Sequence, residues 1–131
     1  MNYTVLRKAL IVMVLMVPLF LDTGCKKQVR CGCGNDVVRT LQKEPARVHF
    51  DVENNSARFN LAGITSDTFY LCNPSAFMEY LSQFTSPVML LVSGEAFWEC
   101  NYLYNSANHP YMPYRVYQIE VTEMEEDLYG K

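Results

Sequence analysis

The sequence has no apolar run long enough to cross a membrane. Its longest such run, residues 9–21, has 13 residues and contains Pro18. A helix of that length reaches about 20 Å, whereas the hydrocarbon core of a bilayer is ~30 Å thick. We therefore expect no permanent transmembrane anchor here.

Basic residues are also scarce. The 131 residues include 11 Lys and Arg against 14 Asp and Glu, which gives a formal net charge of −3. Nucleic-acid binding depends on Lys and Arg side chains that displace counterions from phosphates. The composition therefore predicts no nucleic-acid partner.

Recognisable catalytic motifs are missing as well. The two histidines, His49 and His109, have no partner at a spacing typical of a nucleophilic or metal centre. Asp51 and Glu53 share a face of a predicted strand with His49, so a cluster for acid/base or metal chemistry is an alternative. An exposed polar strand face gives the same pattern. We predict a protein that is not an enzyme, with no catalytic residue, metal or cofactor.

The first 24 residues have the order of a secretory signal peptide. Two basic residues, at positions 7 and 8, precede the apolar run. Asp22 and then Thr23-Gly24-Cys25 follow it. This ending resembles the lipobox of bacterial lipoproteins, although Asp22 stands where that motif usually has leucine. The resemblance implies cleavage before Cys25 and attachment to a membrane through a lipid on Cys25. An ordinary signal peptide, cut nearby, is the alternative.

Four further cysteines are disulfide candidates in an exported chain: Cys31, Cys33, Cys72 and Cys100. Because a single glycine separates Cys31 from Cys33, a bond between them would be strained, so we expect each to pair with Cys72 or Cys100. A zinc site would usually bring a pair of cysteines about two to four residues apart, and redox exchange a pair about two apart. Unpaired buried thiols are the remaining alternative.

The patterning after Cys25 divides the chain into a tether, one β domain and an acidic tail. Residues 25–36 have no apolar period and predict the tether, residues 37–122 the domain, and residues 123–131 the solvated tail. Alternation of apolar and polar residues predicts strands, and so does the short uninterrupted apolar run at 88–92. Strands are expected at 37–41, 47–53, 58–61, 68–72, 88–92 continuing through 95–101 after a bend at Gly94, and 115–121. Turns are expected at 54–56 and 63–67.

The period changes at Asn73-Pro74. Asparagine is a preferred N-cap, and apolar residues then recur at spacings of three and four, which predicts a helix of about three turns. Residues 102–113 are expected to form a loop. The order β-β-β-α-β-β matches the OB-fold, so we predict a mainly β, OB-like barrel with one short helix. A β-rich α+β sandwich would give a similar order.

A further resemblance rests on the stretch from Phe69 to Pro74, the helix after it, the apolar strand 88–92 and Ser93-Gly94-Glu95. This order resembles that of small OB-fold-like cell-envelope lipoproteins of Gram-negative gut anaerobes, over residues 47–121. The resemblance implies a cell-envelope location, with no known activity for most members and no functional residues to carry over. The basic Lys26-Lys27 favours an outer-membrane lipoprotein that faces the periplasm, because related surface lipoproteins are often acidic there.

The predicted loop at 102–113 and the strand before it are rich in aromatic and amide side chains. The candidate ligand-binding residues are Trp98, Tyr102, Tyr104 and Tyr111. Rings stack on the apolar faces of sugars or peptides while amides bond to their edges, which predicts a glycan or peptide site. Tyrosines that only close the end of the barrel are the structural alternative. The functional alternative is a structural or accessory subunit that binds an envelope protein partner.

Overall fold

The computed structural model describes residues 27–128 of the chain. The predicted signal peptide, residues 1–24, and the predicted lipidation site Cys25 lie outside this range. The elements of the described part are β1 (Arg39–Asp51), β2 (Ser56–Leu61), β3 (Ile64–Leu71), a 3₁₀ turn (Pro74–Ala76), α2 (Met78–Leu81), β4 (Val88–Trp98), α3 (Cys100–Asn108) and β5 (Arg115–Glu126).

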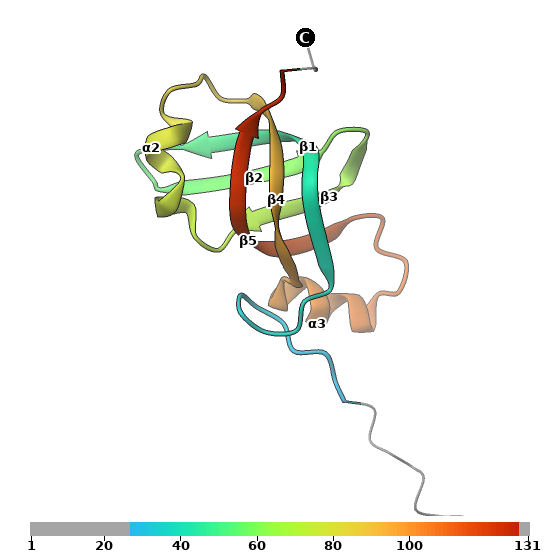
Figure 1. Ribbon diagram of the computed structural model, residues 1–131. Helices are drawn as coiled ribbons and strands as arrows, with labels where there is room; N and C mark the ends of the chain where they lie inside the picture. Colours follow the sequence, from blue (N-terminus) through green and yellow to red (C-terminus); the bar gives the residue numbers. More distant parts are fainter. Residues whose placement is uncertain (1–26, 129–131) are drawn as a thin grey trace, which may run out of the picture.

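The strands form a closed barrel in the order β1-β2-β3-β5-β4, in which β4 pairs back with β1. Neighbouring strands run antiparallel except β3 and β5, which are parallel. Figure 1 shows α2 and α3 at opposite ends of this barrel. The predicted mainly β, OB-like barrel is confirmed, with α3 added between its last two strands.

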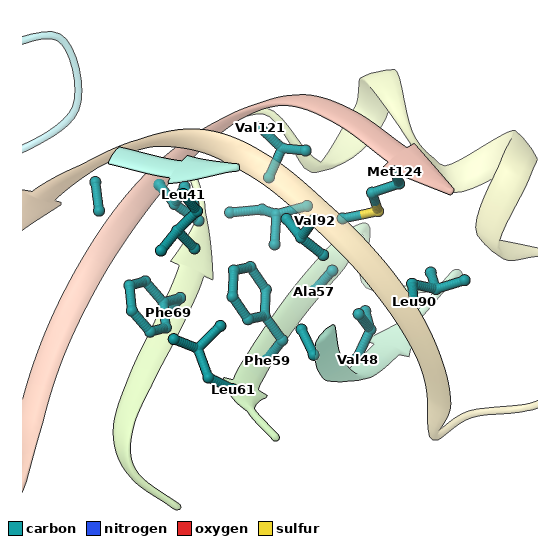
Figure 2. Close-up of a cluster of buried hydrophobic side chains, with 14 of the residues drawn as sticks. Leu41, Val48, Ala57, Phe59, Leu61, Phe69, Leu90, Val92, Val121 and Met124 are labelled. Atoms are coloured by element: carbon teal, nitrogen blue, oxygen red, sulfur yellow. The ribbon is translucent and has the colours of Figure 1, made fainter. Parts of the chain in front are cut away.

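The interior of the barrel is filled by the apolar residues that alternate along each strand. In β2, for example, Ala57, Phe59 and Leu61 are buried, whereas Ser56 and Arg58 are exposed. Side chains from all five strands meet in one cluster, part of which is drawn in Figure 2. The period of two in the sequence therefore decides which face of each strand packs inward.

The first half of the barrel contains one long strand where the sequence predicts two. β1 runs through Lys43, whose φ of 49° accompanies a register shift between Leu41 and Glu44. Residues 39–41 pair with residues 94–96 of β4, and residues 44–48 pair with residues 88–92. A bulge therefore bends the strand where the sequence suggests a break. The turn expected at 63–67 is also shorter, since β3 begins at Ile64.

The predicted three-turn helix is reduced to a 3₁₀ turn followed by the four residues of α2. Met78 and Leu81 of α2 are buried in the core at one end of the barrel. The side chain of Asn73 does not cap this segment. Its Nδ2 donates to the carbonyl of Val121 at 3.0 Å, and its Oδ1 accepts from the Val121 amide at 3.2 Å, so it pairs with β5 like another strand residue.

The last strand is longer than the sequence predicts. β5 continues to Glu126, and Met124 is buried in the core. Glu125 forms an ion pair at 3.1 Å with Lys43, which lies in the bulge of β1. The residues 123–126, expected to start the solvated tail, therefore belong to the barrel.

Two disulfides fasten the segment before β1 to the outside of the barrel. Cys31 is bonded to Cys100, at the start of α3, and Cys33 to Cys72, just after β3. The predicted disulfides are confirmed, and the pairing is now defined. Since β5 lies between β3 and β4, the turn at 31–35 crosses over β5, where Sγ of Cys33 lies 3.5 Å from Oε1 of Gln118. The amide of Gly32 also donates to the carbonyl of Trp98 at 2.9 Å.

Removal of the Cys33–Cys72 bond tests how much this crosslink stabilises the fold. In the double variant Cys33→Ser, Cys72→Ser we expect the free energy of unfolding to fall by about 3 kcal/mol, because a closed loop restricts the unfolded chain. Urea unfolding of the variant and of the wild type, each with and without reductant, measures the loss. An unchanged unfolding midpoint in the variant would contradict this expectation.

At Gly94, β4 shifts register against β5. A Cβ atom at this position would lie 2.5 Å from the carbonyl oxygen of Glu120 and 3.0 Å from Cα of Val121. Both neighbours belong to the backbone and cannot rotate away. Only glycine therefore allows this approach of the two strands.

Gly94→Ala should destabilise the barrel by about 3 kcal/mol, because the added methyl group forces β4 and β5 apart. The exposed neighbour provides a matched control: Glu95→Ala adds no clash and should change stability by less than about 0.5 kcal/mol. Thermal and denaturant unfolding of both variants compare the two sites. Equal effects would show that the close approach at Gly94 is unimportant.

Candidate functional site

The segment from Cys100 to Asn108, expected to be the end of a strand followed by a loop, forms the helix α3. Its first turn is capped by Glu99, whose carboxylate accepts the Tyr102 amide at 2.7 Å. The sequence prediction is wrong here because Asn, Ser and Tyr have low intrinsic helix propensity. Two tertiary contacts hold the helix: the disulfide of Cys100 and the stacking of Tyr102 on Trp98, with ring centroids 5.4 Å apart.

The two sides of α3 carry different kinds of residue. Tyr102 faces the barrel, where it contacts Trp98. Asn101, Tyr104 and Asn108 follow the helical spacing of three and four and lie together on another side. Trp98 and Tyr102 are therefore brought together as expected from the sequence, but Tyr104 belongs to a different surface.

Trp98 and Tyr102 are part of a continuous column of aromatic rings that begins in the core. Successive ring centroids are 4.7 to 5.4 Å apart and nearly parallel, and the last contact, between Tyr102 and Tyr114, is tilted at 6.1 Å. The rings in order are Phe59, Phe69, Tyr117, Trp98, Tyr102 and Tyr114. Trp98 thus has stacking partners in both directions of the column, which gives it a structural role.

Tyr111 lies outside both arrangements. Its side chain is 95% exposed, in the connection between α3 and β5. The structure gives it no ring contact in the part of the chain that it describes. Tyr111 therefore provides an exposed aromatic side chain that belongs neither to the column nor to the surface around Tyr104.

A groove of about 1000 Å³ lies between α3 and the disulfide-bonded segment before β1. We call it the α3 groove. Its apolar lining comes from Val29, Leu103 and Ala107. Its polar lining comprises Gln28, Arg30, Asn35, Asn101, Tyr104 and Asn108. Tyr104 is 76% exposed, so its ring is available beside several amide side chains.

Several of these polar groups are already positioned by local bonds. Nδ2 of Asn35 donates to the Cys31 carbonyl at 2.7 Å, and Arg30 forms an ion pair with Asp36 at 3.2 Å. Hydrogen bonds from the Arg30 amide and guanidinium hold the pKa of Asp36 below its ordinary value. The segment before β1, which forms one wall of the groove, is therefore held by hydrogen bonds as well as by the Cys31–Cys100 disulfide.

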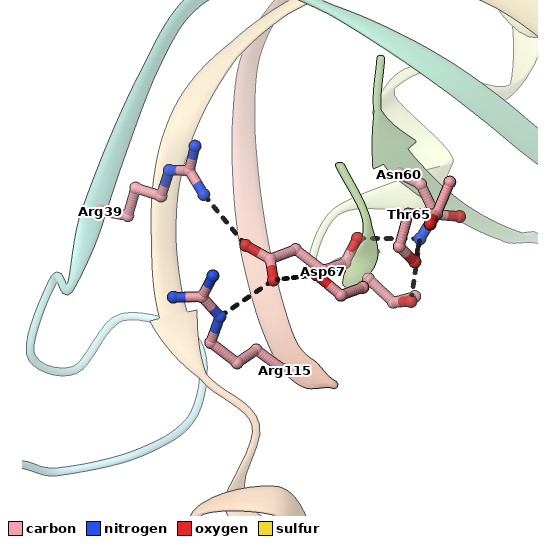
Figure 3. A network of polar contacts seen from close by, with 7 residues as sticks. Arg39, Asn60, Thr65, Asp67 and Arg115 are labelled. Atoms are coloured by element: carbon pink, nitrogen blue, oxygen red, sulfur yellow. Dashed lines mark hydrogen bonds and ion pairs between the residues drawn. The ribbon is translucent and has the colours of Figure 1, made fainter. Parts of the chain in front are cut away.

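A second feature, unnoticed in the sequence, lies at the α3 end of the barrel. Arg39, Asp67 and Arg115 each lie two residues before an interior side chain of their strand, so they form the last inward-facing layer. Figure 3 shows both arginines directed at the carboxylate of Asp67. Nη1 of Arg39 lies 3.3 Å and Nε of Arg115 2.9 Å from its oxygens. We call this layer the charged end.

Asp67 is completely buried, whereas the two arginine side chains reach solvent. Ser66 also donates to the carboxylate at 3.3 Å, and the carbonyl of Asp67 accepts from Asn60 at 2.8 Å. Arg39 in addition lies over the ring of Phe69, 5.8 Å from its centroid. The sequence prediction missed Asp67 because residues 63–67 resembled a turn; the alternation Asp67, Phe69, Leu71 is the signal that could have placed it inside.

Neither histidine lines the α3 groove or pairs with Asp67 at the charged end. His49 and Asp51 border a shallow pocket of about 200 Å³ on the outside of β1 and β2, with Arg58 and Tyr70, and His109 follows α3. Within residues 27–128, no group of three or more His, Cys, Asp or Glu side chains could hold a metal ion. No helix in the same range is long and apolar enough to cross a membrane.

The chain was compared with protein-family models, curated proteins and solved structures, and none of them matches it. The assignment of a function therefore rests on the geometry of the α3 groove and the charged end.

Asp67→Asn tests the structural role of the charged end. Loss of the buried carboxylate leaves the two arginines facing each other without a counterion, and we expect stability to fall by about 3 kcal/mol. Glu120→Gln removes an exposed carboxylate from β5 and should cost less than about 0.5 kcal/mol. Urea unfolding compares the two variants. A loss for Asp67→Asn no larger than that of the control would contradict a stabilising role.

Proposed function

We propose that this protein is a non-catalytic binding module of the cell envelope that holds a glycan in the α3 groove. In this proposal a lipid on Cys25 attaches it to the outer membrane, where it faces the periplasm. The observation that carries the proposal is the exposed ring of Tyr104 beside the amides of Asn101 and Asn108 in one groove. Such a ring packs on the apolar face of a sugar while amides bond to its hydroxyl groups.

The closed barrel favours a glycan over a peptide. Extended peptides commonly bind by adding a strand to an exposed sheet edge. Here each strand has a paired neighbour on both sides over part of its length, and β4 completes the ring by pairing with β1. Little sheet edge is therefore left for a peptide, whereas a sugar needs only the ring and the amides.

The groove walls are well suited to a preorganised site. One wall is a helix capped at Glu99, and the other is attached to that helix by the Cys31–Cys100 disulfide. Ligand binding therefore orders little additional backbone, and such preorganisation lowers the entropic cost of binding.

Trp98 allows the proposal to be tested, because it is the single tryptophan of the chain and stacks on Tyr102 of α3. We expect its fluorescence to change when one member of a panel of envelope and host oligosaccharides binds. Tyr104→Ala should weaken that binding about fivefold, since one aromatic contact is worth ~1 kcal/mol. Tyr111→Ala is the matched control, because Tyr111 is more exposed than Tyr104 but lies outside the groove, and should bind normally.

Three other outcomes would count against the proposal. Equal affinity in the Tyr104→Ala variant would remove the ligand from the α3 groove. A response to extended peptides but not to glycans would favour the peptide alternative. No response to either, together with cross-linking of the lipidated protein into a defined membrane complex, would favour a structural or accessory subunit.

A further inference from the structure

The charged end has more positive than negative charge. Arg39 and Arg115 contribute two guanidinium groups, and Asp67 is the carboxylate placed between them. The two ion pairs therefore share one negative charge, and an excess of one positive charge remains. Both guanidinium groups reach solvent, so a counterion for this excess charge can come from outside the barrel.

The aromatic neighbours do not supply that counterion. Burial raises the pKa of Tyr117, so its phenol stays protonated and neutral at physiological pH. Tyr117 and Asp67 in turn raise the pKa of Arg115, which keeps its guanidinium charged. The structure therefore places next to the arginines one carboxylate, that of Asp67, and the rings of Phe69 and Tyr117.

Donors for a ligand are available at the same place. Asp67 accepts from Nε of Arg115 and from Nη1 of Arg39. Each guanidinium therefore has further N–H groups that do not bond to this carboxylate. The Arg115 side chain is 53% exposed and that of Arg39 is 33% exposed. Solvent, and hence a small ligand, can approach both groups from outside the barrel.

We propose that the charged end is a binding site for the carboxylate group of a small ligand, held by Arg115 and Arg39. A carboxylate carries one negative charge, which matches the excess, and its two oxygens fit the donors of a guanidinium. Tyr114, which is partly exposed and contacts Tyr102, offers a ring to the rest of the ligand. An acidic sugar has both a carboxylate and an apolar face for such a ring. The site does not depend on the α3 groove.

Titration of the oxidised protein with glucuronate tests this site, with glucose as the neutral match and sodium chloride at equal ionic strength as the salt control. We expect saturable shifts of the side-chain nitrogen resonances of Arg115 and Arg39. Glucose and chloride should leave both resonances unchanged. Because these measurements use the wild type, they do not depend on any variant folding.

Variants then identify the groups that bind. Arg115→Gln and Arg39→Gln each leave Asp67 one arginine partner, and each should weaken glucuronate binding at least tenfold. Arg47→Gln removes an exposed arginine from β1, away from the charged end, and should bind normally, as should Tyr104→Ala. An unchanged affinity in Arg115→Gln, an equal shift of the arginine resonances with glucose, or tighter binding of sulfate or phosphate than of glucuronate would each overturn the proposal. None of these outcomes bears on glycan binding in the α3 groove.

Discussion

The route of β4 determines how the rest of the barrel is arranged. This strand pairs with β1 along one edge and with β5 along the other, so it must bend between the two registers. It bends at Gly94, where the backbone of β5 comes too close for any side chain. The bulge at Lys43 makes the corresponding adjustment in β1. The bend also sets the direction in which β4 reaches the α3 end of the barrel, which is built by Trp98, Glu99 and Cys100.

The aromatic column explains why three of the candidate residues, Trp98, Tyr102 and Tyr104, divide into two groups. Rings from the core continue through Tyr117 and Trp98 to Tyr102, so the last of them holds α3 against the barrel. Tyr104, two residues further along the helix, points away from the column because a helix turns by more than a quarter circle per residue. The same short segment thus provides a packing contact on one side and an accessible ring on another.

Much of the barrel could be predicted from the sequence, because apolar residues alternate clearly in β2 and in the second half of β1. The bulge at Lys43 and the helix α3 could not, since each is imposed by contacts between distant parts of the chain and opposes local preference. Trp98 and Tyr104 were identified by residue type alone, and their separation onto two surfaces required the helix. Asp67 was missed for a different reason: a buried charge is recognised only when its partners are known, and Arg39 and Arg115 come from other strands.

The disulfides have a consequence for when the α3 groove can exist. One of its walls precedes the first strand and is attached to the start of α3 by the Cys31–Cys100 disulfide, with additional backbone hydrogen bonds from Gly32 and Val38 to β4. While its thiols are reduced, the chain can complete its sheet without fixing that wall. Formation of the Cys31–Cys100 bond would then be the step that completes the groove, so that ligand binding in it depends on the redox state of the chain.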